Sequence, residues 1–278
     1  MTQTLKGQSA LVTGAGRGFG RAIAHKLASE GAAVTLVSRS REQLDQVVAE
    51  IEDAGGRALA APADVADPVA VARACAAAKA AFGAPDILVN NAGVPWPFGP
   101  VWETDIEKWW QAEAIHIRAP YLFMRNLMPD MVARRSGRVI VIAAIASKIA
   151  LPGLSAYSVG KAALNKLVEI AAVEAEQHNV QVFAVEPGFV VTQLAEDTYN
   201  DPDAQKYMPH MLKYLDEGRA RENADADLYR TADRCAALAA GGYDVLSGRY
   251  MELPDPIDEW KTEAEKARLA AVEAGAAS

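Results

Sequence analysis

Ser9-Ala-Leu-Val-Thr-Gly-Ala-Gly-Arg-Gly-Phe-Gly20 is the stretch of sequence that decides the fold. Its first five residues form an apolar run that predicts a short β-strand. The glycine-rich remainder predicts a turn, and residues 21–30 show the spacing of apolar side chains that is typical of a helix. A strand, a glycine-rich turn and a helix in this order offer backbone N–H groups and a helix N-terminus to a pyrophosphate. We therefore expect a nucleotide-binding site at the start of the chain.

The glycines of this turn allow close approach to a phosphate group, because a side chain would block the approach or forbid the backbone angles of the turn. Their spacing, Gly14, Gly18 and Gly20, differs from the G-x-G-x-x-G of common dinucleotide sites. A glycine-rich turn can also be an ordinary tight turn. The flanking strand and helix favour the nucleotide-binding interpretation.

Strands and helices are predicted to alternate along the rest of the chain. Such alternation indicates an α/β fold, a doubly wound parallel sheet that binds its ligands at the carboxyl ends of the strands. Asp67 is expected as the N-cap of one helix, and Pro68 as its first residue. The expected strands are 33–37, 58–61, 86–89, 138–143 and 180–185, and the expected helices are 41–55, 67–82, 120–133 and 156–177.

The end of the second predicted strand indicates the preferred cofactor. An acidic residue there would accept hydrogen bonds from the ribose of NAD, whereas a basic group would accommodate the 2′-phosphate of NADP. The position carries Ser38 followed by Arg39, and Arg17 lies inside the glycine-rich turn. Guanidinium groups bind phosphate well. We predict NADP as the cofactor, although both arginines could also be ordinary solvated charges.

Tyr157-Ser158-Val159-Gly160-Lys161 places a phenol and an ammonium on one face of a predicted helix. The pKa of a free tyrosine is about 10, and a neighbouring ammonium lowers it. The pair could then protonate a carbonyl or take a proton from an alcohol. A Tyr-x-x-x-Lys pattern alone is also compatible with an amphipathic surface turn, so its meaning depends on the other motifs.

Composition and charge argue against several classes of protein. With 28 Lys and Arg against 36 Asp and Glu, the net charge is −8, which disfavours nucleic acid or an anionic membrane surface as a partner. Cys75 and Cys235 show no disulfide or metal pattern. The longest apolar run, residues 139–146, is too short to span a bilayer, and the first residues lack the apolar stretch of a secretory signal. We expect a cytoplasmic protein.

Together these motifs make the chain resemble the short-chain dehydrogenase/reductase family, over about residues 5–252. The family's T-G-x-x-x-G-x-G corresponds to Thr13–Gly20, its N-N-A-G to Asn90–Gly93 and its Y-x-x-x-K to Tyr157–Lys161. Residues 187–192 are similar to the family's P-G-x-x-x-T. The resemblance implies a Rossmann-type parallel sheet of about seven strands, hydride transfer between NADP and a carbonyl or alcohol, and a homodimer or homotetramer.

The resemblance also implies roles for individual residues. Tyr157 is the acid/base, and Lys161 lowers its pKa and binds the nicotinamide ribose. Asp64 and Val65 flank the adenine, and Asn91–Gly93 support the cofactor and the central strand. The expected cofactor-binding residues are Gly14, Arg17, Gly18, Phe19, Gly20, Ser38, Arg39, Asp64, Val65, Asn91, Ala92, Gly93, Tyr157, Lys161, Pro187, Gly188, Val190 and Thr192.

Two positions depart from the family pattern. The family has a serine thirteen residues before its tyrosine, where this chain has Ala144, and an asparagine of a water-linked proton relay, where it has His116. Losing one donor at a developing oxyanion typically costs about 10² to 10³ in rate. Ser147, Ser155 or the substrate itself could supply the missing donor. Alternatively, the acceptor could be an imine or a conjugated system, or redox activity could be weak.

His116 could serve the relay or touch the substrate as a third catalytic residue, because imidazole titrates near about pH 6.5. A histidine that is only packed in its helix is the alternative. Ala144 and Trp96 are the candidate substrate-binding residues. Trp96 belongs to an aromatic, proline-rich loop, residues 95–102, which could line a pocket for a bulky apolar substrate or pack over the next helix.

The chain is expected to form one domain, residues 1–258, in which about 193–231 is a substrate lid rich in methionine and aromatic side chains. The same side chains could equally be core. Residues 259–278 are expected to be a helical or frayed tail. The expected function is an NADP(H)-dependent oxidoreductase for a small hydrophobic ketone, alcohol or imine. The alternative is a cofactor-binding protein with little redox turnover, either a non-redox enzyme or a regulatory binder.

Overall fold

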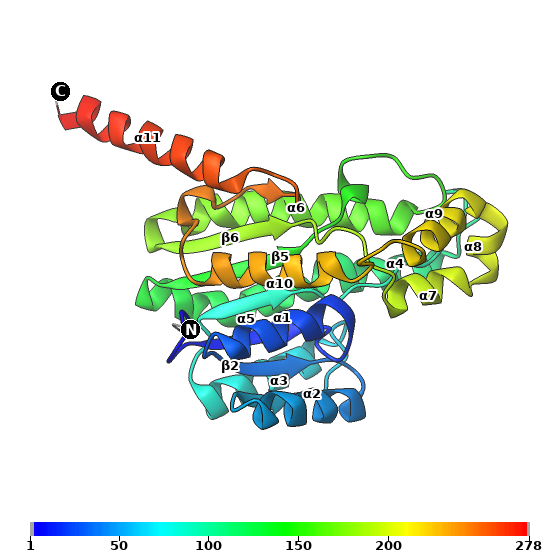
Figure 1. Ribbon diagram of the computed structural model, residues 1–278, viewed down its shortest axis with the longest axis horizontal. Helices are drawn as coiled ribbons and strands as arrows, with labels where there is room; N and C mark the ends of the chain where they lie inside the picture. The colour runs from blue at the N-terminus through cyan, green and yellow to red at the C-terminus, as the bar shows by residue number, and fades with distance from the viewer. Residues whose placement is uncertain (1–2, 277–278) are drawn as a thin grey trace.

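Seven parallel strands form one sheet, in the order β3-β2-β1-β4-β5-β6-β7, within residues 3–276, the part of the chain that this computed structural model describes. Helices cover both faces of the sheet (Figure 1). The predicted class, a Rossmann-type doubly wound α/β fold, is confirmed. The strands are β1 (Ser9–Thr13), β2 (Ala33–Val37), β3 (Arg57–Ala60), β4 (Ile87–Asn90), β5 (Gly137–Ile142), β6 (Val180–Val185) and β7 (Tyr250–Met251).

The helices form two layers around the sheet. One core packs under α3, α5 and α6, and a second core packs under α1, α2 and α10. A π-helical turn, Ala114–Arg118, joins α4 directly to α5. The helices are α1 (Gly18–Ser29), α2 (Arg41–Asp53), α3 (Pro68–Phe82), α4 (Ile106–Glu113), α5 (Ala119–Arg134), α6 (Ser155–Ala175), α7 (Gln193–Tyr199), α8 (Pro202–Tyr207), α9 (Pro209–Arg219), α10 (Ala226–Ala239) and α11 (Ile257–Ala276).

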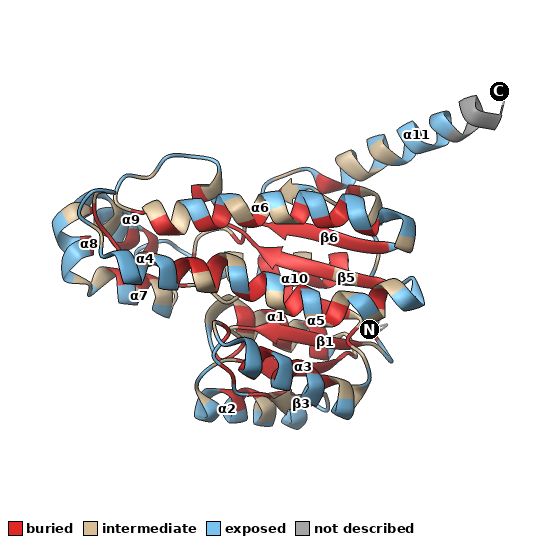
Figure 2. Cartoon of the chain, turned by 180° about the vertical axis from the view of Figure 1, so that it is seen from behind, coloured by how far each residue is buried: buried red, intermediate tan, exposed pale blue. Residues whose placement is uncertain are grey.

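The central strands contribute side chains to both layers. Along β6, Val182 and Ala184 belong to the core on the α6 side, and Phe183 and Val185 to the core on the α1 side. Figure 2 shows the central strands as buried. A strand that is covered on both faces reads as a continuous apolar run, which explains why the sequence locates these strands to within a residue or two.

Helix boundaries follow the predicted caps, with one difference. The Asp67 carboxylate accepts a hydrogen bond from the N–H of Val69 at 2.8 Å, and a proline is the first residue of α3, as predicted. The first helix, predicted over 21–30, instead begins at Gly18. Glycines contribute no apolar side chain to the helical pattern, so the pattern starts later than the helix. The end of the glycine-rich turn is therefore the first turn of α1.

The segments predicted as lid and tail extend beyond the sheet. Helices α7, α8 and α9 lie beyond one end of it, and α11 projects from the rest of the chain (Figure 1). Residues 259–276 of the predicted tail are helical as part of α11; 277–278 lie outside the described residues. Ile257 is buried against the second core, whereas Leu269 is 64% exposed. None of the helices within residues 3–276 has the length and apolar character needed to cross a membrane.

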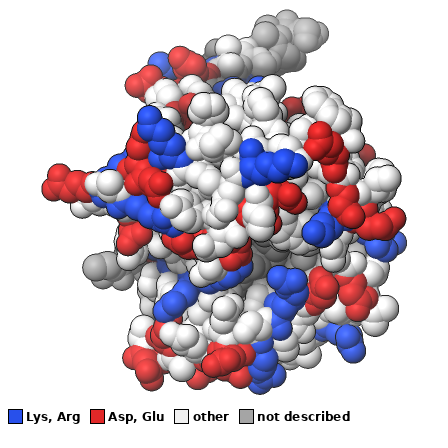
Figure 3. Space-filling model, turned by 90° about the vertical axis from the view of Figure 1, so that its right-hand side faces the viewer, with Lys and Arg blue, Asp and Glu red and all other residues white. Residues whose placement is uncertain are grey.

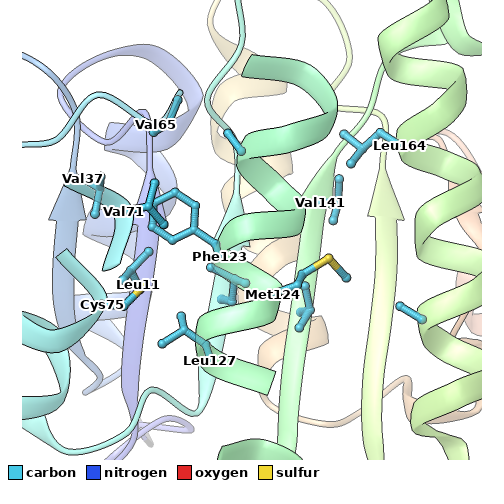
Figure 4. Packing of buried hydrophobic residues seen from close by; sticks show 14 of the residues in the cluster. Leu11, Val37, Val65, Val71, Cys75, Phe123, Met124, Leu127, Val141 and Leu164 are labelled. Carbon is cyan, nitrogen blue, oxygen red and sulfur yellow. The ribbon is translucent and has the colours of Figure 1, made fainter. Parts of the chain in front are cut away.

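Replacing Phe123 by alanine tests how much this core stabilises the fold. Phe123 of α5 is fully buried beside Val71 of α3 (Figure 4). Removing the ring leaves a cavity, so we expect a loss of about 3–5 kcal/mol in the free energy of unfolding, measured by chemical denaturation. Arg125→Ala, on the exposed side of the same helix, is the control and should cost less than about 0.5 kcal/mol. Equal losses in both variants would contradict this assignment.

Candidate active site

The glycine-rich turn leaves the N-terminus of α1 open. Gly14 and Gly18 have positive φ angles of 65° and 55°, which favour glycine. A Cβ atom on Gly20 would lie 2.2 Å from the carbonyl oxygen of Gly14, so the turn closes only around a residue without a side chain. The side chain of Arg17, the N-cap of α1, makes no capping hydrogen bond. The first N–H groups of α1 are therefore available to an anion.

Thr13 fixes this turn against the neighbouring strand. Its hydroxyl oxygen accepts hydrogen bonds from the backbone N–H groups of Asn91 at 2.9 Å and Ala92 at 3.0 Å. The side-chain amide of Asn91 donates to the carbonyl oxygen of Thr13 at 2.9 Å. β1 and β4 are thus joined where both strands end. Sequence reasoning assigned no role to Thr13, although this residue opens the T-G-x-x-x-G-x-G motif.

A groove of about 520 Å³ lies over this junction. Its lining contains most of the expected cofactor-binding residues: Gly14, Arg17, Gly18, Phe19, Ser38, Arg39, Asp64, Val65, Asn91, Ala92, Gly93 and Thr192. Sequence reasoning missed Gly16, Ser40, Gln43, Ala63, Val94, Ile115, Gln193 and Leu194. Ser40 has a sequence signal that could have found it, since it is the N-cap of α2 and accepts a hydrogen bond from the N–H of Gln43.

The other expected cofactor-binding residues lie outside this lining: Gly20, Tyr157, Lys161, Pro187, Gly188 and Val190. The loop after β6 is held by hydrogen bonds of its own. The carbonyl oxygen of Pro187 accepts from the hydroxyl of Thr231 at 2.7 Å, and the N–H of Gly188 donates to the carboxylate of Glu186 at 3.0 Å. These contacts order the loop independently of any ligand.

The two arginines near the groove differ in their partners. Arg39 is exposed in the groove, and its guanidinium makes no hydrogen bond or ion pair within the described residues. Arg17 forms an ion pair with Asp197 of α7 at 3.2 Å. Figure 3 shows basic and acidic side chains interspersed over this end of the molecule. Arg39 is thus the guanidinium that a 2′-phosphate could bind without displacing a protein partner.

Tyr157, Lys161 and His116 come together beside the groove. The rings of Tyr157 and His116 meet edge to face, with centroids 5.3 Å apart. The Nζ atom of Lys161 lies 5.8 Å from the centroid of the Tyr157 ring and donates a 2.7 Å hydrogen bond to the carbonyl oxygen of Ile142. A Cβ atom on Gly93, a groove residue, would lie within 3.8 Å of both His116 and Lys161. The groove and the three side chains therefore meet at Gly93.

Burial controls the protonation of Tyr157 and Lys161. It raises the pKa of Tyr157 to about 12, and the carboxylate of Glu186 adds to the rise. Burial also lowers the pKa of Lys161 to about 8. The sequence predicts a tyrosine pKa below its usual value, so this prediction is wrong for the structure as it stands. The Lys161 ammonium is directed at the carbonyl of Ile142, and the cost of removing the phenolate from water dominates.

His116 is a neutral, buried imidazole. Its Nε2 atom lies 2.9 Å from the carbonyl oxygen of Val94, and since a carbonyl only accepts, Nε2 carries the hydrogen. Nδ1 is then an acceptor, and it has no hydrogen-bond partner among residues 3–276. Burial lowers the pKa of His116 to about 3, and the Lys161 ammonium adds to the decrease. The side chain is thus packed within its helix and also faces the Tyr157–Lys161 pair.

The two serine hydroxyls that could replace the donor missing at Ala144 differ in their hydrogen bonds. The Ser147 hydroxyl donates to the carbonyl oxygen of Ala144 at 2.7 Å and accepts from the Asn165 amide. The Ser155 hydroxyl accepts from the indole N–H of Trp109 at 3.1 Å. The Ser147 hydrogen is therefore already donated, whereas the Ser155 hydrogen has no acceptor among the described residues.

Trp96 lies in a small apolar cluster between the aromatic loop and the lid. The cluster includes Met208, and Tyr157 and Tyr207 pack against it together with Trp96. Trp96 and Tyr207 also line a second cavity of about 310 Å³. The lid side chains thus form a local core on the side of the catalytic tyrosine candidate. Contact of Trp96 or Ala144 with a substrate stays a prediction.

Comparison with known proteins agrees with the motifs and with the fold. The family model described as short chain dehydrogenase matches residues 8–203, from β1 to the first turn of α8. The chain belongs to the short-chain dehydrogenase family. The resemblance expected from the sequence is therefore confirmed, while the functional meaning of the substitutions at Ala144 and His116 stays a prediction.

Several relatives match this short-chain dehydrogenase over most of its length. A short chain dehydrogenase of Pseudocercospora fijiensis is 33% identical over 267 residues, covering 94% of this chain and 85% of that protein. A metagenomic short-chain oxidoreductase solved in complex with NADP is 37% identical, with a TM-score of 0.70, covering 85% of this chain and 92% of its own. A putative NAD(P)-dependent gluconate 5-dehydrogenase of Beutenbergia cavernae, with NADP bound at low occupancy, is 29% identical, with a TM-score of 0.78, covering 91% and 97%.

Gly20→Ala tests whether the closed glycine turn is needed to hold a dinucleotide. The added Cβ atom would lie 2.2 Å from the carbonyl oxygen of Gly14, so the turn must open. We expect at least about a tenfold loss of NADPH affinity, measured by fluorescence titration, with the fold retained. Gly242→Ala is the control, because the nearest atom to its Cβ would be at 3.8 Å. Unchanged affinity in Gly20→Ala would show that the turn does not bind the cofactor.

Proposed function

We propose that this short-chain dehydrogenase is an NADP(H)-dependent oxidoreductase that transfers a hydride between nicotinamide and a hydrophobic ketone, alcohol or imine. The observation that carries the proposal is the position of Gly93, which lines the groove and also borders His116 and Lys161. A dinucleotide held along the groove would reach the Tyr157–Lys161 pair at this point. When bound, the nicotinamide supplies or accepts the hydride.

The choice of NADP rests on the charges at the end of β2. The position that is acidic in many NAD sites carries Ser38 here. Beside it, Arg39 presents a guanidinium to the groove that is not bound to another described residue. A guanidinium matches the charge and the geometry of a phosphate. NADP in two of the solved relatives supports the same choice.

Tyr157 is the proposed proton donor and acceptor. A phenol with a pKa of about 12 is protonated at neutral pH, so it can give a proton to the oxygen or nitrogen of a substrate that has received hydride. The ammonium of Lys161 would stabilise the phenolate that remains, because both residues lie on one face of α6. His116, in the place of the family's asparagine, would connect Lys161 to the next proton source.

The apolar surroundings of Tyr157 favour a hydrophobic substrate. Trp96 and the lid residues Tyr207, Met208 and Met211 form the apolar cluster at this tyrosine. Methionine and aromatic side chains adapt to irregular apolar ligands. The lid would then close over the substrate and exclude water from the reaction.

A second candidate function is a cofactor-binding protein with little redox turnover. Ala144 favours it, together with the Ser147 hydroxyl, whose hydrogen is already donated to a backbone carbonyl, because a developing oxyanion would lack the family's serine donor. The buried Lys161 argues against it. Keeping an ammonium 3% exposed is costly, and a protein that only binds a cofactor has no need of the Tyr157 phenol beside it.

Assembly and location stay predictions. We expect a homodimer or homotetramer, a cytoplasmic location and one domain over residues 1–258 with a lid at about 193–231. The apolar side chains exposed on α4, α5 and α6 offer surface to a second copy of the chain. They include Trp110, Tyr121, Val159 and Val173.

Arg39→Asp should weaken NADPH binding selectively. The change removes the proposed partner of the 2′-phosphate and adds a repelling charge, so we expect at least about a tenfold loss of NADPH affinity with little change for NADH. Fluorescence titration with both cofactors measures the difference. Arg41→Gln is the control, because the Arg41 guanidinium pairs with Asp45 outside the groove lining. Equal losses for the two cofactors would refute the NADP assignment.

Tyr157→Phe and Ala144→Ser together test the chemistry. NADPH consumption is followed over a panel of hydrophobic ketones and cyclic imines. We expect turnover by the native protein and a loss of about 10² or more in Tyr157→Phe, since general acid catalysis contributes about 10² to 10⁴. Ala144→Ser should increase the rate of ketone reduction. It should increase the rate with the best substrate of the native protein less, if that substrate needs no hydroxyl donor. NADPH binding without any turnover would instead support the second candidate function.

A further inference from the structure

The carboxyl group of Glu113 and the Nδ1 atom of His116 are buried without hydrogen-bond partners within the described residues. Glu113, the last residue of α4, is 4% exposed, and neither of its carboxyl oxygens has a partner within the described part of the chain. His116, one turn further along, is 1% exposed, and its Nδ1 atom is also without a partner there. Buried polar groups are almost always hydrogen-bonded. Two such exceptions within one helical turn of each other, beside the Tyr157–Lys161 pair, need a physical explanation.

Gly160 of α6 provides the space that both side chains occupy. A Cβ atom on Gly160 would lie 2.9 Å from Oε2 of Glu113, and 2.6 and 3.1 Å from Cβ and Cγ of His116. The carboxyl group and the imidazole therefore border the same point on α6. Gly160 directly precedes Lys161 in α6. Glu113 reaches the inside of the site only because this glycine has no side chain.

The two groups are complementary as hydrogen donor and acceptor. Burial raises the pKa of Glu113 to about 7, so near neutrality a large fraction carries an O–H hydrogen. Nδ1 of the neutral His116 is an acceptor. The other titratable groups around the pair are Tyr157 and Lys161, both on α6. Lys161, with a pKa of about 8, is a slightly stronger base than the Glu113 carboxylate, so a proton moves from the acid to the amine with a small gain.

We propose that Glu113 is a positioning residue that stores a proton for the active site and delivers it through His116 to Lys161. The inference rests on the proposed function. In the reductive direction Tyr157 gives its proton to the substrate and takes one from the Lys161 ammonium. A water bridging the two unpartnered groups then takes the Glu113 proton and gives one of its own protons to Nδ1 of His116, which leaves a carboxylate and an imidazolium. The Nδ1 proton passes to the Lys161 amine, and water returns a proton to Glu113.

The space beside Gly93 offers a path from His116 to Lys161. Nδ1 of His116 and Nζ of Lys161 both lie within 3.8 Å of the point where a Cβ atom of Gly93 would be. The space left there by Gly93 is polar on two sides and could hold one bridging water. The carboxylate formed at Glu113 offsets the charge of the imidazolium, which burial alone would make unfavourable.

Glu113→Gln is the test, because glutamine keeps the shape of the side chain but holds no exchangeable acid proton. In the native protein we expect the reductive kcat to fall as the pH rises through about 7 and Glu113 ionises. In Glu113→Gln the kcat should drop roughly tenfold and lose this dependence, while NADPH affinity stays unchanged. Glu107→Gln removes an exposed carboxylate from the same helix and should keep the native profile. A native pH profile in Glu113→Gln would overturn the proposal.

Stability against pH gives a second measurement that needs no substrate. The folded state raises the pKa of Glu113 from 4.5 to about 7, so the folded state binds this proton more tightly and loses stability as the pH rises between these values. The Tm of Glu113→Gln minus the Tm of the native protein should therefore be larger at about pH 8 than at about pH 5. For Glu107→Gln this difference should be the same at both pH values. Parallel Tm curves together with good ketone or imine turnover would overturn this proposal alone. The expected Tm difference without any turnover would overturn the relay together with the proposed function.

Discussion

The reversal of strand order between β1 and β4 is the constraint on which the site depends. From β1 the chain builds the sheet outwards to β3 on one side, and from β4 it builds outwards to β7 on the other. The loops that follow β1 and β4 therefore lead in opposite directions and leave a crevice between them. The Thr13 hydroxyl closes the base of this crevice by accepting two backbone N–H groups from the segment after β4. The glycine turn above it can then be tight, because the peptide groups beneath are already satisfied. The groove, the ion pair between Arg17 and Asp197, and the catalytic candidates Tyr157, Lys161 and His116 all lie around this junction.

Desolvation, more than attraction between charges, sets the electrostatics of the interior. Burial shifts the pKa of Tyr157, Lys161, His116 and Glu113 in the direction that favours each neutral form. The cluster therefore has little charge of its own at neutral pH apart from the ammonium that the Ile142 carbonyl holds. Within this cluster Glu113 and Lys161 are the two groups of similar basicity, so a proton can pass between them at little cost. Desolvation also explains why a pairing rule read from spacing alone gave the wrong direction for Tyr157.

The sequence predicts the fold well because its signals are local. Apolar runs mark strands covered on both faces, and the Asp67–Pro68 cap marks a helix start that the structure reproduces. The residues around the groove follow strand ends, and the topology gathers those ends at one edge. The features that escaped prediction depend on contacts between distant segments. The ion pair of Arg17 with Asp197 joins the first turn to the lid, and the burial of Glu113 depends on a glycine 47 positions later.

The absence of a side chain at Gly160 makes the residues allowed at positions 113, 116 and 160 depend on one another. Because the side chains of Glu113 and His116 fill the space beside it, a larger residue at 160 is compatible only with smaller or reoriented groups at 113 and 116. Substitutions at these positions should thus be non-additive, and the order in which they arise decides which intermediates fold. The close approach of His116 to α6 therefore requires a residue without a side chain at position 160.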